Sequence, residues 1–350
     1  MQQLIEVPPG LAGVAVTDTS VGDVLGEQGL YHYRGRSAPE LARNEGFESV
    51  AAFVLNGSSQ PLRTERALPS ELRDVVHRLD LRSALSLYGA LSDFRSITEI
   101  DEDARQADAI RLISVMPTLV ASTHHRAPVD PNPSLSHVAD YLRMLHGTAA
   151  SDDQVAALEA YFVLTIDHGF SNSTFATRVV ASTGADLAAC VLAGLGALSG
   201  PRHGAAVERV LGMFDAIGAP SAAEQWMKGE IASGRRLQGF GHSVYRTPDP
   251  RLELMRELGA ALNPERHVMA MAAEQAGGRV LAGRRLAPNV DLHSAVVLEG
   301  CGVPRGLFAA TFAAARMVGW CAHALEQAHD NKIIRPAARY VGPLPDMDIY

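Results

Sequence analysis

The 350-residue sequence predicts a mainly α-helical protein of two domains, with a small β-hairpin near its N-terminus. Hydrophobic residues make up 47% of the chain but aromatic residues only 6%, so Ala, Leu and Val must supply most of the core. Such a core favours closely packed helices over stacked sheets. Apolar residues also recur at three- and four-residue steps through most of the chain, which is the period of an amphipathic helix.

The hairpin is predicted from two glycine-flanked segments rich in β-branched and aromatic residues, 13–17 and 30–35. The pattern then becomes helical, and it is broken by prolines at 130–133, with Ser134 or Ser136 as the cap of the next helix. The helices predicted from periodicity cover approximately residues 40–55, 69–91, 103–123, 134–146, 152–167, 182–198 and 307–327.

A change in composition predicts the division into domains. Residues 206–302 carry more charged side chains than the rest, which indicates a smaller, more solvated domain inserted into a larger one made of 1–205 and 303–350. The helix at 182–198 is rich in Ala and Gly, so it should lie at a tightly packed centre or at a subunit interface.

Charge and cysteine content narrow the class of protein. The formal net charge of −8 argues against a nucleic-acid partner, because phosphate binding needs a basic face. Cys190, Cys301 and Cys321 are odd in number and lie in apolar surroundings, which indicates free thiols in a reducing compartment. The N-terminus does not resemble a signal peptide, and the most apolar stretch is too short to span a bilayer. These features predict a cytoplasmic protein without a membrane anchor.

Three polar residues stand in glycine- or proline-rich segments between predicted helices, and together they could form and use an enol. His203 lies in Gly-Pro-Arg-His-Gly, His242 ends Gly-Phe-Gly-His, and Asp291 ends Pro-Asn-Val-Asp. A carboxylate can remove a proton from carbon only when the developing oxyanion is stabilised as the proton leaves. One imidazole could stabilise that oxyanion, and the other could polarise an electrophilic carbonyl.

Each of these residues also has an ordinary structural alternative that the sequence leaves open. His203 could help to cap the preceding helix, and Asp291 could cap the following one. The segment after His242 carries Arg246 and Arg251 among prolines. It suits an anionic ligand, but it could also be an exposed basic turn.

Two further arginines and a histidine stand in apolar surroundings. Arg316 lies on the helix at 307–327, which has almost no polar face, and an isolated buried charge is very costly. Its partner could be an anionic ligand or a distant acid. Arg335 lies between isoleucines and a proline, and its planar fork suits a carboxylate. His168 ends an apolar run, where it could be a core residue or line a cavity with Asn172–Thr174.

Two other patterns are incomplete. The glycines at 194–200 follow a helix rather than a strand, so they do not form a dinucleotide-binding fingerprint. His124 and His125 are adjacent, and no Cys, Asp or Glu cluster beside them completes a metal site. The sequence therefore predicts neither a bound metal nor a cofactor.

Taken in order, these segments resemble the citrate synthase family, and most closely its shorter bacterial branch, which includes 2-methylcitrate synthases. The resemblance covers nearly the whole chain. The matching motifs are Gly10–Val14, Tyr33–Gly35, Met116–Thr118, Pro131–Pro133, Asp167–His168, Asn172–Arg178, Gly200–Gly204, Gly239–Arg246, Pro288–Asp291 and Arg335–Pro336.

The resemblance implies a helical homodimer in which the small domain closes on the large one over a shared active site. It implies that Asp291 removes a methyl proton from acetyl-CoA, that His203 hydrogen-bonds the thioester oxygen, and that His242 polarises the keto carbonyl of oxaloacetate. Hydrolysis of citryl-CoA then drives the reaction forward. Apart from the coenzyme A thioester, no cofactor and no metal is implied.

The resemblance also implies a set of binding residues. By motif position, the ligands of oxaloacetate are His168, Arg251, Arg316 and, from the other subunit, Arg335. The residues lining coenzyme A are Gly239, Phe240, Gly241 and Arg246.

The chain departs from the family pattern at several places. Gly169 stands where many members carry Glu, Ala205 and Val207 alter a Gly-Gly-Ala-Asn motif, Ser243 replaces a common Arg, and His293 alters the aromatic pair that usually follows the catalytic Asp. The segment after the Arg-Pro motif is also short. These departures bear on substrate choice and rate rather than on reaction class.

Three functions are therefore considered. The first is a citrate synthase that condenses acetyl-CoA with oxaloacetate. The second is a 2-methylcitrate synthase that uses propionyl-CoA, since one methyl group changes binding by only about 1–3 kcal/mol. The third is a catalytically silent paralogue that binds coenzyme A or a partner protein.

Overall fold

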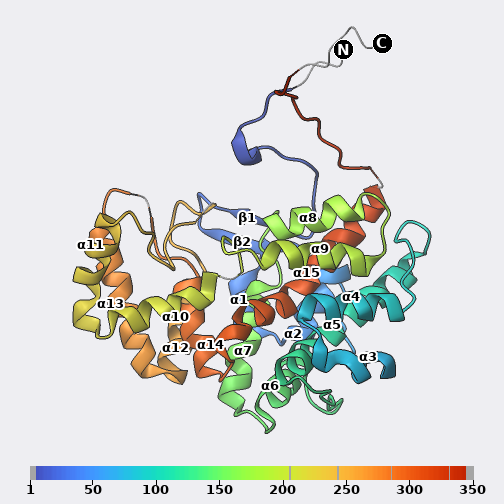
Figure 1. Ribbon diagram of the computed structural model, residues 1–350, viewed down its shortest axis with the longest axis horizontal. Helices are drawn as coiled ribbons and strands as arrows, with labels where there is room; N and C mark the ends of the chain where they lie inside the picture. Colours follow the sequence, from blue (N-terminus) through green and yellow to red (C-terminus); the bar gives the residue numbers. More distant parts are fainter. Residues whose placement is uncertain (1–4, 205, 243, 285, 331, 344–350) are drawn as a thin grey trace.

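The computed structural model describes residues 5–204, 206–242, 244–284, 286–330 and 332–343, and its regular structure is almost entirely helical. Most helices pack around α15 (Phe308–Asp330), which crosses the centre of the molecule (Figure 1) and is buried along most of its length. Around it lie α1 (Ala38–Asn44), α2 (Phe47–Asn56), α3 (Ser70–Val75), α4 (Leu81–Leu91), α5 (Glu102–His125), α6 (His137–His146), α7 (Asp152–Thr165), α8 (Asn172–Ala181) and α9 (Leu187–Leu198). The prediction of a mainly helical fold is confirmed.

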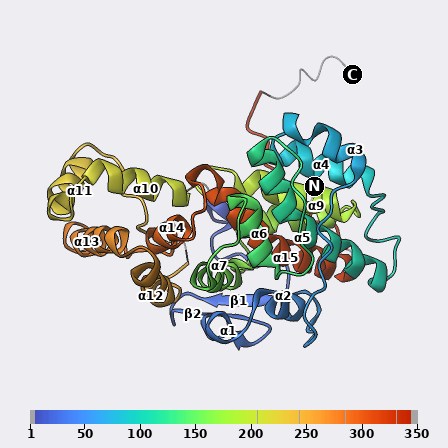
Figure 2. The ribbon, with the colours of Figure 1, turned by 90° about the horizontal axis from the view of Figure 1, so that it is seen from below.

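The remaining helices lie together at one end of the molecule (Figures 1 and 2). They are α10 (Ala206–Ile217), α11 (Ala223–Ala232), α12 (Leu252–Leu262), α13 (Pro264–Val280) and α14 (Asp291–Gly300). All five fall inside the charged segment at 206–302. We propose that they form the small domain expected from the sequence.

The small sheet is antiparallel, but its first strand is not where the sequence predicted it. β1 (Gly22–Leu25) pairs with β2 (Leu30–Tyr33), which pairs with β3 (Arg36–Ser37). The prediction for 13–17 is wrong, because that segment pairs with no strand in the described structure. A tight turn needs its two strands close in sequence, and Gly29 at φ +65° closes the turn between β1 and β2.

This turn also brings the sheet against the loop that carries His242. The backbone N–H of Arg246 donates to the carbonyl oxygen of Gly26 at 3.0 Å. A Cβ atom built on Gly26 would lie 2.4 Å from the carbonyl oxygen of Val244, so any larger residue would push the two loops apart.

Two of the predicted helices are divided. The segment at 69–91 contains α3, a short 3₁₀ turn and α4, because Asp80 caps the start of α4 by accepting a hydrogen bond from the Ser83 N–H at 2.8 Å. The segment at 40–55 contains two helices, because α1 ends at Asn44 and Gly46 is the N-cap of α2. Helix α8 was not predicted at all.

The other helices predicted from periodicity are confirmed, with their ends moved by a few residues. Of the two serines considered as the cap before α6, Ser136 is the one used, since it accepts a hydrogen bond from the Ala139 N–H at 3.2 Å. The predicted helix at 182–198 begins later, at α9, after Asp186 caps its first turn.

Close packing of α8, α9 and α15 depends on Gly194 of α9. A Cβ atom at this position would lie 2.5 Å from the Thr177 hydroxyl and 2.9 Å from the Trp320 ring.

We therefore expect Gly194→Ala to lower the free energy of unfolding by about 1–3 kcal/mol, the usual cost of overpacking. Gly212, an exposed glycine of α10 with open space around it, is the matched control. Gly212→Ala should raise stability by about 0.5–1 kcal/mol through helix propensity. Denaturant titration of both variants measures the difference, and equal effects would contradict this account of the packing.

Candidate active site

Four segments that are far apart in the chain meet at one place: 166–169 after α7, 200–204 after α9, 239–251 before α12, and the residues leading into α14. The convergence is visible in their electrostatics. The positive charge of Arg251 lies close enough to lower the pKa values of His168, His242 and Asp291. The positive charge of Arg316 likewise lowers the pKa values of His168 and His203. The structure therefore brings six of the candidate site residues together.

Asn289 ties the loop of His242 to the loop that leads into Asp291. Its amide Nδ2 donates to the carbonyl oxygen of Gly241 at 2.8 Å, and its backbone N–H donates to the carbonyl oxygen of Gly239 at 2.9 Å. Gly239 and Gly241 have φ of +76° and +86°, which L side chains rarely adopt. The two glycines thus allow a backbone path that places His242 beside the start of α14.

His242 is held in one tautomer. Its Nδ1 accepts hydrogen bonds from the backbone N–H groups of Val244 at 3.0 Å and Tyr245 at 3.1 Å. Nδ1 must therefore be unprotonated, and the proton of the neutral ring lies on Nε2. Burial and the charge of Arg251 lower the pKa of His242 to about 4, so the ring is a neutral hydrogen-bond donor near pH 7.

Asp291 is the first residue of α14, and it does not cap that helix. The cap position is Val290, and the backbone N–H of Asp291 itself donates to Asn289 Oδ1 at 3.1 Å. Burial raises the pKa of Asp291 to about 6, although the positive charge of Arg251 opposes the shift and the negative charge of Asp249 adds to it. A carboxylate with such a pKa is a stronger base than an ordinary surface aspartate.

His203 is held by Ser173, whose hydroxyl lies 2.9 Å from Nε2 of the ring. The ring meets Phe312 edge to face, with centroids 6.2 Å apart. Burial, with the charge of Arg316 adding to it, lowers the pKa of His203 to about 4. The imidazole is therefore neutral near pH 7, and it bonds to α8 rather than capping α9. Ser173 was not singled out for this position from the sequence.

Arg251 is buried, with 4% of its surface exposed, so the alternative of an exposed basic turn does not hold for this residue. Its guanidinium forms a two-pronged ion pair with Asp249, at 2.9 Å from Nε and 2.8 Å from Nη2. Asp249 also accepts the backbone N–H of Val290 at 3.1 Å. Asp249 was missed from the sequence, although its spacing of two residues from Arg251 could have suggested the pair.

Arg316 is also buried, at 1% exposure. Its Nε donates to the carbonyl oxygen of Thr165 at 2.7 Å, and its guanidinium lies 4.7 Å from the centroid of Phe312. Its Nη1 is buried without a hydrogen-bond partner among the described residues. Of the two alternatives, an anionic ligand or a distant acid, the first agrees with this vacant donor, although the charge of Asp167 acts on Arg316.

His168 lies among aromatic rings at the same place. Its Nε2 is 2.9 Å from the Tyr245 hydroxyl, and its ring centroid is 5.4 Å from that of His242. Burial is the largest cause that lowers its pKa well below 6.5, so the ring is neutral near pH 7. His168 is half-buried and faces His242, which agrees with a residue lining a cavity rather than one sealed in the core.

The described residues contain no group of three or more His, Cys, Asp or Glu side chains that could hold a metal ion. The three cysteines are buried free thiols. Within the described ranges, no helix is both long and apolar enough to cross a membrane.

Comparison with known proteins decides the family. Residues 10–337 match the family described as citrate synthase, C-terminal domain. The chain belongs to the citrate synthase family. The resemblance found in the sequence is thus confirmed, and the protein is an enzyme of the acyltransferase class to which this family belongs.

Relatives with two different names match almost the full length of the chain. Putative citrate synthase 2 of Mycobacterium tuberculosis is 35% identical over 96% of this chain and 93% of its own. A 2-methylcitrate synthase of the same species is 33% identical over 96% of this chain and 91% of its own. The citrate synthase of Thermoplasma acidophilum, solved as a ternary complex with carboxymethyl coenzyme A and oxaloacetate, superposes with a TM-score of 0.90 at 27% identity and 97% coverage of both chains.

Arg335 lies apart from the other candidate residues. It is exposed in the C-terminal segment, which extends away from the body together with the N-terminal segment (Figure 1). The backbone N–H of the preceding Ile334 donates to the Ser182 hydroxyl at 3.0 Å, which holds the base of this segment against α8. Within one chain, therefore, Arg335 does not join the site.

The departures from the citrate synthase family pattern occupy different surroundings. Gly169 adopts φ of +60°, and Val207 is buried on α10. His293 is fully buried, and its Nε2 lies 2.7 Å from Glu274 of α13. Ala205 and Ser243 lie outside the described residues.

Proposed function

We propose that this chain is a citrate synthase, condensing acetyl-CoA with oxaloacetate to give citrate and coenzyme A. The observation that carries the proposal is the pairing of a carboxylate of raised pKa, Asp291, with two histidines that are neutral at pH 7. Asn289 links the loop of His242 to the start of α14. Deprotonation of a thioester methyl needs a base and an oxyanion donor at the same moment.

In the first step, Asp291 takes a proton from the methyl group of acetyl-CoA. His203 donates a hydrogen bond to the thioester oxygen as it gains charge and passes that proton to it, giving an enol, whose O–H returns the proton to His203 when the new carbon–carbon bond forms. If the Ser173 hydroxyl donates to Nε2 of His203, the proton of the ring lies on Nδ1, which is then the donor to the substrate. Ser173 is thus proposed as the residue that orients His203.

In the second step, the enol carbon attacks the keto carbon of oxaloacetate. His242 polarises that carbonyl through Nε2–H and gives its proton to the new alkoxide, forming citryl-CoA. Hydrolysis of the thioester then releases citrate and coenzyme A. No metal and no further cofactor takes part in the proposed sequence.

The charges of oxaloacetate are proposed to be bound by His168, Arg251 and Arg316. The vacant Nη1 of Arg316 supports this, because an anionic ligand would satisfy a buried donor. Arg335 is proposed to reach the site of a second subunit in a homodimer. Its exposure at the base of a segment that leaves the body agrees with such an arrangement.

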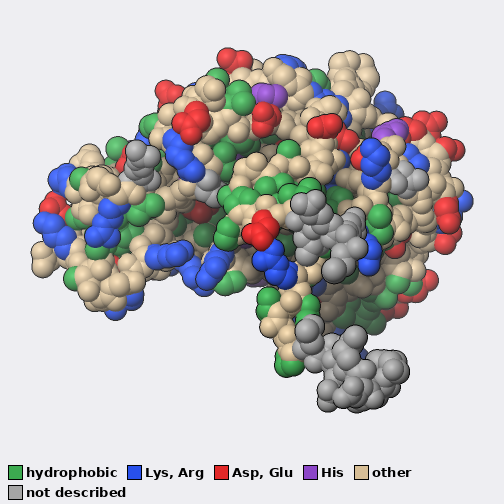
Figure 3. Space-filling view, turned by 90° about the horizontal axis from the view of Figure 1, so that it is seen from above, with side chains coloured by type: hydrophobic (Ala, Val, Ile, Leu, Met, Phe, Trp, Pro, Cys, Tyr) green, Lys and Arg blue, Asp and Glu red, His purple; other side chains and the backbone are tan. Residues whose placement is uncertain are grey.

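Coenzyme A is proposed to lie along Gly239, Phe240 and Gly241, with Arg246 beside its phosphates. The ring of Phe240 fits against Gly277 of α13, where a Cβ atom would lie only 2.2 Å from it. Figure 3 shows Lys and Arg side chains along the junction between the α11–α13 end and the rest of the molecule. Positively charged side chains at this place suit a phosphorylated co-substrate.

The second candidate is 2-methylcitrate synthase, and the 33% identity with a relative of that name favours keeping it. Release of free thiol from acetyl-CoA and from propionyl-CoA, each with oxaloacetate, separates the two. We expect a higher kcat/KM with acetyl-CoA. A preference for propionyl-CoA would establish the alternative, and release from neither would indicate a silent paralogue.

The pH dependence provides a further expectation. Asp291 must be ionised to act as a base, and its pKa is about 6. We therefore expect kcat/KM to be constant near pH 7–8 and to fall tenfold per pH unit below about pH 6. The pKa values of His203 and His242, about 4, keep both rings neutral over this range, so one proton should account for the fall. A plateau that extends to pH 5 would contradict Asp291 as the base.

A further inference from the structure

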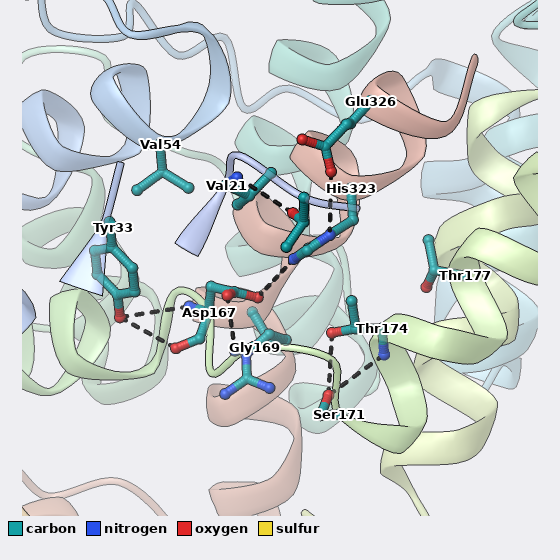
Figure 4. A network of polar contacts seen from close by, with 12 residues as sticks. Val21, Tyr33, Val54, Asp167, Gly169, Ser171, Thr174, Thr177, His323 and Glu326 are labelled. Atoms are coloured by element: carbon teal, nitrogen blue, oxygen red, sulfur yellow. Dashed lines mark hydrogen bonds and ion pairs between the residues drawn. The ribbon is translucent and has the colours of Figure 1, made fainter. Parts of the chain in front are cut away.

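A line of buried and partly buried polar side chains runs behind the proposed ligands of oxaloacetate. It includes Glu326 and His323 of α15 and Asp167, which lies two residues after the end of α7 (Figure 4). Arg178 of α8 lies at its far end and Arg316 at its near end. In this line a neutral imidazole lies between two carboxylates, and each carboxylate is balanced by one arginine.

Arg178 is the hub at the far end, and only 1% of its surface is exposed. Its Nε donates to Gln327 Oε1 at 2.9 Å, its Nη1 to Glu326 Oε2 at 2.6 Å, and its Nη2 to the Thr17 hydroxyl at 3.3 Å. Its Nη1 also lies 3.3 Å from His323 Nδ1. The guanidinium is thus fixed from three sides.

This contact determines the tautomer of His323. A guanidinium can only donate hydrogen bonds, so Nδ1 of His323 must accept the one from Arg178. The fully buried ring is therefore neutral and carries its proton on Nε2. Nε2 lies 3.3 Å from Asp167 Oδ1, a close polar contact, although neither atom has a hydrogen-bond partner of regular geometry among the described residues.

Asp167 is a buried carboxylate, with 1% exposure, at the edge of the active site. Its Oδ2 accepts the backbone N–H of Gly169 at 2.9 Å, and its carbonyl oxygen accepts the Tyr33 hydroxyl at 3.2 Å (Figure 4). Burial alone would raise its pKa, but the polar contact from His323 and the charge of Arg316 lower it, so the group is ionised. Its charge balances that of Arg316, and the next residue along the chain is His168.

We propose that Arg178 and His323 are positioning residues for the oxaloacetate site. Arg178 fixes His323 as the Nε2–H tautomer, and His323 holds Asp167 in place. Asp167 then balances the buried charge of Arg316 without hydrogen-bonding to its Nη1, which stays available for a substrate carboxylate. The identity of that substrate rests on the proposed function, whereas the tautomer does not.

The tautomer is tested directly by long-range ¹H–¹⁵N correlation NMR on the full chain with ¹⁵N-labelled histidine. The signals of His323 are those missing from the His323→Gln variant. We expect the pattern of a neutral ring protonated on Nε2 in the wild type, and a loss of this single pattern in Arg178→Lys, which removes the fork. A ring protonated on Nδ1, or on both nitrogens at pH 7, would overturn the proposal.

The consequence for the site is tested by kinetics. His323→Gln keeps an N–H donor towards Asp167, and we expect its constants to stay within about threefold of the wild type. His323→Leu removes the donor, and the KM for oxaloacetate should rise by about tenfold or more while the KM for the acyl-CoA changes by less than about threefold. Equal changes in both KM values, or no change in either, would contradict a positioning role.

Two further measurements cover a variant that does not fold and a wild type that has no thiol-releasing activity. If His323→Leu does not fold, as judged by circular dichroism and a thermal melt, the same split of KM values is measured on Arg178→Lys. If the wild type releases no thiol from any acyl-CoA, the proposed function fails. Calorimetric binding of oxaloacetate to the wild type and the variants then decides the inference, and equal affinities would reject it.

Discussion

The Asp291→Asn variant is expected to lose turnover by about three orders of magnitude, which is the usual contribution of a general base. Asparagine has nearly the same shape as aspartate but cannot accept the methyl proton. Because oxaloacetate is proposed to bind through His168, Arg251 and Arg316, its affinity should change little. Thiol release measures the first effect, and isothermal calorimetry with oxaloacetate measures the second.

The same substitution should make the protein more stable. The pKa of Asp291 rises from 3.8 to about 6 on folding, so the ionised group costs about 2–3 kcal/mol at pH 7. The folded state binds the proton of Asp291 more tightly than the unfolded state does. Protonation therefore favours the folded state at low pH, and this contribution is lost as the pH rises through about 6. The stability advantage of Asp291→Asn should therefore be largest at pH 7 and should disappear near pH 4.

Asp153 offers a matched control, since it is an exposed acid in the first turn of α7. Asp153→Asn removes the same charge from the start of a helix, where an acid normally stabilises the macrodipole. It should leave turnover unchanged and lower stability by about 0.3–1 kcal/mol. A fully active Asp291→Asn enzyme would remove Asp291 from the position of base. A less stable one would show that its carboxylate is not strained by burial.

The second large effect is expected at Asp249. Replacing it with alanine leaves Arg251 buried without its carboxylate, and breaking a buried ion pair from one side costs about 3–5 kcal/mol. The start of α14 also loses the acceptor for the Val290 N–H. Activity should fall too, because Arg251 would no longer be held in one orientation beside Asp291. Denaturant titration and steady-state kinetics with varied oxaloacetate measure the two losses.

Two further variants show whether the loss of stability in Asp249→Ala comes from the unpaired buried charge of Arg251. Glu257→Ala breaks the exposed pair between Arg43 and Glu257 and should cost less than about 1 kcal/mol. The double variant Asp249→Ala/Arg251→Met removes both buried charges and should recover part of the stability but none of the activity. If Asp249→Ala costs no more than Glu257→Ala, Arg251 is not dependent on its partner.

Much of the helical architecture could be predicted from periodicity, because the spacing of apolar residues that buries one face of a helix can be seen within a single continuous segment. Failures came where a local feature competed with that pattern. The cap at Asp80 divides one predicted helix, and the turn at Gly29 moves the first strand to Gly22–Leu25. Helix α8 was missed because its polar residues, such as Ser173, were read only as parts of a cavity.

The candidate site shows the same division between local and distant information. His203, His242 and Asp291 could be selected because each lies in a short motif with a backbone requirement of its own. His323 could not be recognised as a partner of Asp167, since these residues lie in segments that are far apart in the chain. Asp249 lies only two residues from Arg251, so that pair was missed although its spacing could have suggested it. Arg316 was noticed as a buried charge, but the vacancy at its Nη1 depends on what Thr165 and Asp167 supply.

By itself, the sequence determined that this protein is helical, that it belongs with the citrate synthases, and which chemical groups are available to it. Only the tertiary structure decided the protonation of those groups. The pKa of Asp291 depends on burial in the folded site and on the charges of Arg251 and Asp249, and the tautomer of His242 depends on two backbone N–H groups turned towards its Nδ1. Proton affinity depends on the surroundings of a group in space, and those surroundings exist only once the chain has folded.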